Sequence, residues 1–179
     1  MGLIVLLATV AARADERATR VIVLVRHGEK AAAPADDAVL SDAGRTRADA
    51  LAAALGDAHV DAIITTQFAR TRLTAKPLAE ARHLTPIVIE GGGDTAAHVR
   101  ATAAAVRAQP AGFIVVVGHS NTITPLIAAL GGPTLPDICD GEYSRLFTLV
   151  LPADGPSRLI QSHYGAPDPA EPCGWRMGR

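Results

Sequence analysis

The chain has 179 residues, of which 49% are apolar and 20% are charged. This composition is typical of one globular domain with a sizeable core, and it excludes an intrinsically disordered chain. The formal net charge is −1, so no overall field attracts nucleic acid or an anionic membrane, and we expect no nucleic-acid partner. Any binding of an anion must then depend on arginines that are placed locally.

The N-terminal segment resembles an export signal. An apolar run over residues 3–12 leads to Ala12-Arg13-Ala14, which fits a small-x-small cleavage site. A signal peptide usually begins with Lys or Arg, which is missing here, and a start codon placed too late would explain the difference. The alternative is that the run forms the first strand or helix of the domain. We expect residues 1–14 to be a signal peptide and residues 15–179 to be a single domain.

Export would also decide the location of the protein and the state of its cysteines. The apolar run is too short to span a bilayer, so we expect no stable membrane insertion after cleavage and a periplasmic or secreted protein. Without export the protein would be cytoplasmic. Cys139 and Cys173 can pair in an oxidising compartment, or they can be unrelated thiols. The sequence leaves the oligomeric state open.

Strands and helices alternate along the rest of the chain. Apolar runs at 21–25, 60–66 and 113–118 are typical of parallel strands covered on both faces. Helices are predicted at 40–57, 69–82, 94–109 and 121–132, a short strand at 86–90, and two sheet-edge strands at 145–151 and 157–164. Ser41 is a candidate N-cap, and Pro77 is expected to kink or divide its helix. The pattern predicts a three-layer α/β/α sandwich with a mainly parallel central sheet.

Ionisable side chains follow the predicted strands at the points where they end. Arg26 and His27 follow the first strand, Arg70 lies shortly after the second, Glu90 ends the third, and His119 follows the fourth. Ligands of open α/β sheets bind beyond the carboxyl ends of the strands, so these groups are expected on one rim. Arginine binds phosphate bidentately, and histidine can act as a nucleophile or proton carrier near neutral pH.

The order and spacing of these residues resemble the histidine phosphatase superfamily, which is also called phosphoglycerate mutase-like. The motifs are "LVRHGEK" at 24–30, "TTQFARTRLTA" at 65–75 and "VVGHSNT" at 116–122. Residues 66–75 match the family pattern Ser/Thr-x-x-x-Arg-x-x-x-Thr-Ala. The resemblance runs from Arg26 to about Tyr164 and implies a phosphoglycerate mutase-like fold. Since little chain lies between Ala75 and Phe113, we expect a minimal cap over an open pocket.

The resemblance also implies roles for the residues that match the motifs. His27 would be the nucleophile and would carry the phosphoryl group as a phosphohistidine. Arg26 and Arg70 would hold the phosphate oxygens, and His119 would complete the pocket and donate a hydrogen bond to them. Fixed guanidinium groups can compensate the charge of the transferred group without a metal ion. We therefore expect a phosphomonoester hydrolase that acts on a small phosphorylated substrate with no metal and no cofactor.

The proton donor of this reaction stays open at the level of the sequence. Glu90 is our first choice, because family members usually place a carboxylate in the segment after the second arginine motif. Asp94 is the other candidate there, although it can also be a helix N-cap, and some small members need no carboxylate. Asn121 and His163 are possible accessory residues, and Asn121 can instead cap the following helix.

Two other functions compete with this interpretation. Residues 116–122 also resemble the nucleophile elbow of a serine esterase, with Ser120 as nucleophile, but Thr122 replaces the second glycine of that motif. The chain could also be a phosphate-binding module without catalysis. If the protein is exported, phosphorylated envelope sugars or scavenged phosphomonoesters are the expected substrates. Otherwise a protein phosphohistidine phosphatase becomes competitive. Glu29 and Lys30 receive no chemical role from the sequence.

Overall fold

The structure is a computed structural model, and it describes residues 19–33 and 37–168. The predicted signal peptide at 1–14 and Cys173 lie outside the described residues. Within them, no helix has the length and hydropathy that crossing a bilayer requires.

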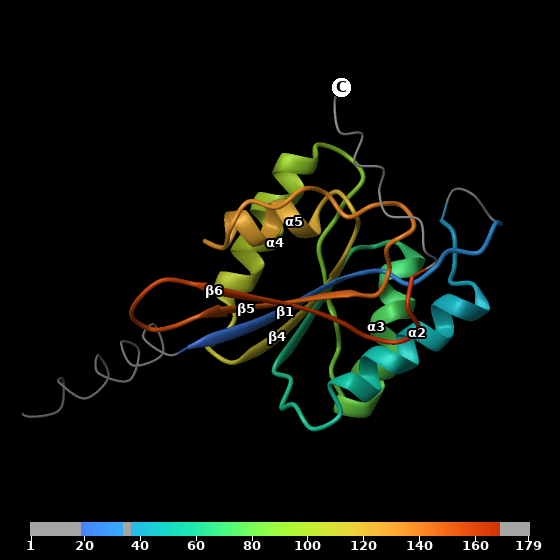
Figure 1. Cartoon of the computed structure of the whole chain (residues 1–179), viewed down its shortest axis with the longest axis horizontal. Helices are drawn as coiled ribbons and strands as arrows, with labels where there is room; N and C mark the ends of the chain where they lie inside the picture. Colours follow the sequence, from blue (N-terminus) through green and yellow to red (C-terminus); the bar gives the residue numbers. More distant parts are fainter. Residues whose placement is uncertain (1–18, 34–36, 169–179) are drawn as a thin grey trace, which may run out of the picture.

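A single six-stranded sheet forms the centre of the molecule, with the strand order β3-β2-β4-β1-β5-β6 (Figure 1). The strands are β1 (Arg20–Arg26), β2 (Ala62–Thr65), β3 (Ile87–Val88), β4 (Phe113–Gly118), β5 (Arg145–Leu151) and β6 (Arg158–His163). The first four are parallel to one another, whereas β5 pairs antiparallel with both β1 and β6. This confirms the expected mainly parallel sheet. Of the two strands expected at an edge, only β6 is one, because β5 is paired on both sides.

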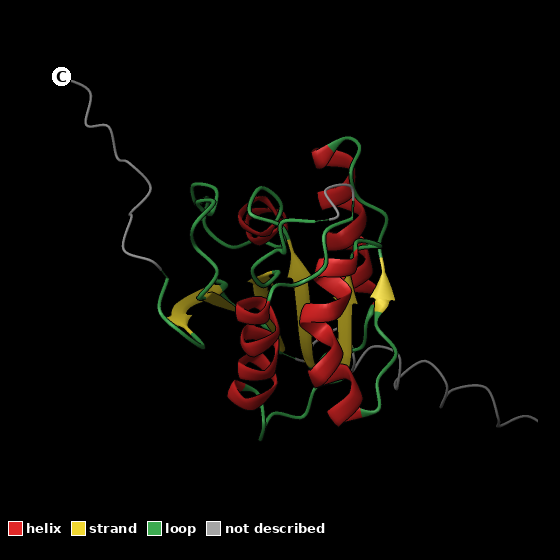
Figure 2. Cartoon of the chain, turned by 90° about the vertical axis from the view of Figure 1, so that its right-hand side faces the viewer, coloured by secondary structure: helices red, strands yellow, loops and turns green. Residues whose placement is uncertain are grey.

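Helices cover both faces of the sheet, as the strands' continuous apolar runs predicted (Figure 2). The helices are α2 (Asp42–Ala54), α3 (Ala69–Arg82), α4 (Thr95–Ala108) and α5 (Ile123–Ala129). Alternate residues of one strand point to opposite faces. On β1, Ile22 and Leu24 therefore pack with α4 and α5, while Val23 and Val25 pack with α2 and α3. The expected three-layer sandwich is confirmed.

Two side chains hold the first turns of helices α2 and α3. Ser41 accepts a hydrogen bond from the Gly44 amide and starts α2, as predicted. The first turn of α3 is held from a distance, because the Ala69 amide donates to Asp37 at 2.8 Å. Helix α3 continues through Pro77 to Arg82, so of the two expected effects of this proline, a kink or a division, the division does not occur. Proline removes one backbone donor, and the apolar packing of α3 holds the helix together around it.

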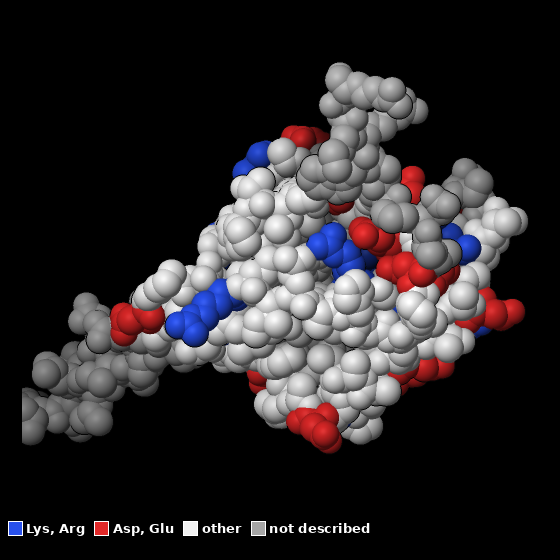
Figure 3. Space-filling view, in the orientation of Figure 1, with Lys and Arg blue, Asp and Glu red and all other residues white. Residues whose placement is uncertain are grey.

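On the face of the molecule that Figure 3 shows, charged groups are spread without a large region of one sign. On the face shown in Figure 3, Lys and Arg atoms lie in small groups, and Asp and Glu atoms lie beside some of them. This distribution agrees with the near-neutral net charge of −1.

Candidate active site

A cavity of about 340 Å³ opens at the carboxyl ends of β1 and β4. Arg26, His27, Arg70 and His119 all line it. The sequence analysis expected these four residues on one rim, and the structure brings them together. The remaining lining residues are Lys30, Phe68, Gly91, Gly92, Gly93, Thr95, His98, Ser120, Asn121, Thr122 and Asp140. The larger, mostly apolar hollow between α3 and β3, of about 820 Å³, contains none of the four.

His27 lies directly after β1 and its ring is buried, with a relative exposure of 4%. Its Nδ1 is 2.7 Å from the Gly28 carbonyl oxygen. Because a carbonyl can only accept, Nδ1 carries the hydrogen and Nε2 keeps its lone pair. Burial lowers the pKa of His27 to about 3; His119 and the arginines act in the same direction, and the Gly28 bond opposes them. His27 is therefore neutral near pH 7, as a nucleophile must be.

The loop after His27 packs tightly against two helices. A Cβ on Gly28 would lie 2.8 Å from the carbonyl oxygen of Gly44 in α2. This is a steric clash, and glycine avoids it because it has no Cβ. The Gly28 amide donates to the Thr74 hydroxyl of α3 at 2.8 Å, and Thr74 donates to the Arg70 carbonyl at 2.8 Å. The loop after His27 and the helix that carries Arg70 are thereby joined through one buried hydroxyl.

Arg70 lies in the first turn of α3, and its guanidinium faces His119. The guanidinium carbon lies 4.4 Å from the centroid of the Phe68 ring, a cation–π contact, and Nη2 is 3.5 Å from Nδ1 of His119. Its Nε is buried and has no hydrogen-bond partner among the described residues. Burial lowers the pKa of Arg70, and Asp37 opposes this effect. An anion in the cavity would supply the missing acceptor and charge.

His119 follows β4 and is held by two neighbours. Its Nε2 is 3.2 Å from the Thr66 hydroxyl. Since Arg70 can only donate toward Nδ1, the hydrogen of His119 is on Nε2 and is donated to Thr66. Burial lowers the pKa of His119 to about 4, and Arg70 adds to the effect. The ring centroids of His27 and His119 are 5.4 Å apart. To donate to a phosphate, His119 must exchange one of these partners for the ligand.

Arg26 is buried at the end of β1 and is held by a turn from late in the chain. Its Nη1 lies within hydrogen-bond distance of three backbone carbonyls, those of Cys139 at 2.6 Å, Asp140 at 2.8 Å and Glu142 at 3.0 Å. The guanidinium carbon also lies 4.2 Å from the centroid of the Tyr143 ring. Nη1 is thus engaged by the turn, whereas Nε has no hydrogen-bond partner among the described residues. Nε and Nη2 are the donors left for an anion.

Neither carboxylate expected as proton donor lines the cavity. Glu90 is exposed, and its backbone carbonyl accepts from Nδ1 of His98 at 2.8 Å. Asp94 accepts from the Ala96 amide at 2.9 Å and caps α4, which is the alternative role that the sequence left open for it. The expectation of Glu90 as proton donor therefore has no support in the geometry.

The two possible accessory residues are separated in the structure. Asn121 lines the cavity. His163 lies at the end of β6, where its Nδ1 is 2.8 Å from the Ser144 hydroxyl, and it does not line the cavity. Ser120 also lines the cavity, but its hydroxyl has no histidine within hydrogen-bond distance in the described part of the chain. A serine nucleophile needs such a base, so the esterase alternative loses its basis.

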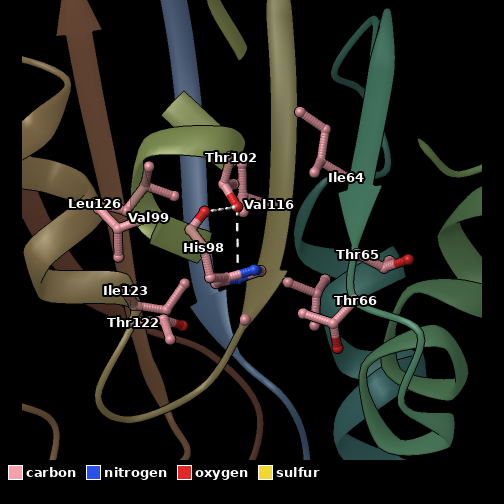
Figure 4. A pocket seen from close by; sticks show the side chains of 12 residues that line it. Ile64, Thr65, Thr66, His98, Val99, Thr102, Val116, Thr122, Ile123 and Leu126 are labelled. Atoms are coloured by element: carbon pink, nitrogen blue, oxygen red, sulfur yellow. Dashed lines mark hydrogen bonds between the residues drawn. The ribbon is translucent and has the colours of Figure 1, made fainter. Parts of the chain in front are cut away.

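Several lining residues were not singled out by the sequence. Gly91 is held by the Gln67 side chain, which donates to its carbonyl at 2.7 Å and accepts from its amide at 2.8 Å. The ring of His98 lies against the ends of β2 and β4, with Nε2 3.4 Å from the Thr102 hydroxyl (Figure 4). Gln67 and His98 together hold the backbone of Glu90 and Gly91 at the start of the wall that Gly91, Gly92 and Gly93 form. Neither has a sequence signal, because both bonds depend on the fold.

Glu29, which had no assigned role, forms a partly buried ion pair with Arg47 of α2. Arg47 is 3% exposed, and its Nη2 donates to Glu29 Oε1 at 2.7 Å. Its Nη1 donates to the carbonyls of Tyr164 and Ala166, both at 3.0 Å, and Nη2 lies 3.7 Å from Asp168 Oδ1. This network, which we call the Arg47 network, ties the loop after His27 to the segment after β6.

Comparisons with known proteins agree with this fold. A family model described as histidine phosphatase superfamily (branch 1) matches residues 22–92, which include Arg26, His27 and Arg70. The comparison with curated protein sequences gave no match.

Solved structures with the same fold are numerous. The protein histidine phosphatase SixA, solved with tungstate, has a TM-score of 0.62 and 19% identity, covering 80% of this chain and 96% of its own. A mycobacterial glucosyl-3-phosphoglycerate phosphatase has a TM-score of 0.61 and 19% identity, covering 79% and 97%. A putative phosphohistidine phosphatase SixA from Nakamurella multipartitia has a TM-score of 0.56 and 22% identity, covering 83% and 98%. At these identities the likeness concerns the fold. Together with the family model over residues 22–92 and the expected motifs, it supports the assignment of the chain to the histidine phosphatase superfamily.

Proposed function

We propose that the protein is a phosphomonoester hydrolase that works through a phosphohistidine on His27, without a metal ion. The observation that carries the proposal is the bond from His27 Nδ1 to the Gly28 carbonyl, which leaves Nε2 free in a cavity with two arginines. A neutral ring with a fixed tautomer is ready to attack phosphorus. A site that only bound phosphate would not need an unprotonated histidine in this place.

The reaction divides into two displacements at phosphorus. In the first, Nε2 of His27 forms a bond to phosphorus, and the bond to the leaving oxygen breaks while that oxygen takes a proton. In the second, water attacks phosphorus, the N–P bond returns its electrons to Nε2, and the water gives up a proton. Arg70 and the free donors of Arg26 compensate the charge on the phosphoryl oxygens in both steps.

The cavity is consistent with a small phosphorylated substrate. It is open and lined mainly by polar groups, and glycines 91–93 form one wall without side chains. Two of the structural neighbours are phosphatases, one for protein phosphohistidine and one for glucosyl-3-phosphoglycerate. We propose that the protein is exported and acts on phosphorylated envelope sugars or scavenged phosphomonoesters. N-terminal sequencing of the protein from an exported fraction should then begin at Asp15, and a sequence beginning at Met1 contradicts export.

The hydrolase proposal is tested with a panel of phosphomonoesters in the presence of a chelator. Wild-type protein should turn over several of them, and His27→Ala should lose at least about 10³-fold in kcat. The matched control is His59→Ala, because His59 is an exposed histidine that pairs only with Asp61. Radiolabelled phosphate should be trapped in acid-labile form on wild type and on the control. A requirement for metal, or unchanged turnover in His27→Ala, contradicts the mechanism. Tight phosphate binding without any turnover would support the binding module instead.

A further inference from the structure

Asp140 is the only carboxylate among the described residues that line the cavity. We propose that Asp140 is the proton donor of the first step and the proton acceptor of the second. This proposal rests on the proposed function. It places the proton donor after His119 in the chain, whereas the sequence analysis expected the donor at Glu90, after the second arginine motif. Its side chain is fully exposed to solvent at the mouth of the cavity.

The turn that carries Asp140 has a fixed place relative to both histidines. The carbonyls of Cys139, Asp140 and Glu142 all accept from Nη1 of Arg26, the residue before His27. On the other side, the Ile138 amide donates to the carbonyl of Ser120 at 3.1 Å, one residue after His119. Backbone bonds therefore set the distance of Asp140 from the site, and only its short side chain has to reach a leaving group.

Asp140 also lies beside a guanidinium that a phosphoryl group would use. Its Oδ1 is 3.7 Å from Nη2 of Arg26, which is one of the donors left for an anion. A phosphoryl group bound by this donor would therefore lie close to the Asp140 carboxyl group.

In the proposed sequence, Asp140 starts the first step as the acid and ends it as the carboxylate. Its proton goes to the leaving oxygen as the P–O bond breaks and the bond from His27 forms. The carboxylate then accepts a proton from the attacking water as the N–P bond breaks. One substrate and one water give an alcohol and inorganic phosphate, and both residues return to their initial states.

The other ionisable groups near the cavity are less suited to this role. Glu90 and Asp94 do not line it. His98 does, but its Nδ1 is bound to the Glu90 carbonyl and its Nε2 lies against Thr102. Lys30 lines the cavity as an exposed cation, which favours binding of an anion over acid catalysis.

The test compares two substrates that differ in their need for a proton. Glycerol phosphate has an alkoxide leaving group that must be protonated, whereas p-nitrophenyl phosphate releases a stable phenolate. For Asp140→Asn we expect kcat/KM on glycerol phosphate to fall by about 10²- to 10³-fold, and on p-nitrophenyl phosphate by less than about tenfold. Since kcat/KM reports steps up to formation of the phosphohistidine, slower hydrolysis of the intermediate does not affect it. Asp140→Glu should recover part of the loss on glycerol phosphate.

Three further variants make the result decisive. Asp57→Asn, an exposed aspartate outside the cavity, should leave kcat/KM unchanged for both substrates. Equal losses for both substrates in Asp140→Asn, or no loss, overturn the proposal. A loss confined to glycerol phosphate in Glu90→Gln or His98→Gln, rather than in Asp140→Asn, also overturns it and names the true donor. Each of these outcomes leaves the proposed function standing, because that depends on His27→Ala.

Discussion

The amide of Gly28 donates a 2.8 Å hydrogen bond to the hydroxyl of Thr74, and Thr74 is completely buried. The same hydroxyl donates to the Arg70 carbonyl. One side chain therefore sets the position of the loop after His27 relative to the helix that carries Arg70. These two hydrogen bonds of Thr74, which we call the Thr74 joint, give the first of four predictions.

Thr74→Val should weaken both stability and catalysis. Valine keeps the shape of threonine but leaves the buried Gly28 amide without an acceptor, which costs about 1–3 kcal/mol. In the hydrolase assay we expect kcat to fall by about tenfold or more, because the loop of His27 is no longer fixed. Thr74→Ser, which keeps the hydroxyl, should retain most of the activity. Equal activity of the valine and serine variants would show that the joint does not position His27.

Gly44→Ala should destabilise the protein although alanine is the better helix former. A Cβ at this position would lie 2.2 Å from the Glu29 carbonyl oxygen, so the loop after His27 and α2 must move apart. Overpacking of this kind costs about 1–3 kcal/mol or more. The control is Gly93→Ala, where a Cβ meets no atom within 4 Å. Urea denaturation of both variants measures the difference, and equal stability would contradict the close approach.

Arg47→Met should be among the most damaging single substitutions away from the cavity. It leaves Glu29 and two carbonyls without their buried partner. Removal of one member of a fully buried ion pair costs about 3–5 kcal/mol, and we expect a smaller loss here because the Glu29 side chain is 23% exposed. Arg47→Lys should recover only part of this, because an ammonium group cannot serve three separate acceptors with the same geometry. Thermal or urea unfolding measures both variants.

The control for the Arg47 network lies in the same helix. Arg45 is exposed and pairs with Asp42 on the surface. Such surface pairs contribute little, so Arg45→Met should change the free energy of unfolding by less than about 1 kcal/mol. A similar loss in both variants would mean that helix propensity, rather than the network, explains the effect.

The two site histidines make stability depend on pH. The pKa is lowered from 6.5 to about 3 for His27 and to about 4 for His119. Between pH 6.5 and about 4, the unfolded chain binds protons that the folded chain excludes. The free energy of unfolding therefore falls as the pH is lowered through this range, by at most about 1.4 kcal/mol per pH unit for each ring.

Urea denaturation at several pH values between 7 and 4.5 checks this prediction. His27→Gln should flatten the dependence relative to wild type, whereas His59→Ala should not, since His59 is exposed. An unchanged slope in His27→Gln would contradict a neutral, buried His27. Inorganic phosphate should reduce the acid sensitivity at moderate pH, because a bound dianion favours the protonated rings.

The sequence predicted the parts of the site that follow strand ends. Arg26, His27 and His119 come directly after apolar runs, and in a parallel sheet such positions meet at one edge. Asp140 has no such signal. It lies on an irregular turn, and its relation to Arg26 spans 114 positions of the chain.

The other differences have the same origin. Glu90 was chosen because it ends a predicted strand after the second arginine motif, but β3 ends at Val88, and Gly91, Gly92 and Gly93 line the cavity whereas Glu90 does not. Glu29 received no role because its partner Arg47 lies inside a helix whose pattern only indicates that it is amphipathic. Contacts that depend on which loops the fold places together cannot be read from local periodicity.

The hydrogen bonds from Arg26 to the backbone of residues 139–142 affect the order in which the site forms during synthesis. The guanidinium is synthesised 113 to 116 residues before the carbonyls that accept from it. Until that turn arrives, a cation at the end of the central strand lacks its partners, so this part of the growing chain should stay hydrated and open. A nascent chain that has already produced Arg26, His27, Arg70 and His119 would still lack a finished pocket. The proposed activity should therefore appear late in synthesis, when the turn at residues 139–142 packs against Arg26. This turn lies beyond residues 22–92, the part of the chain that the family model matches.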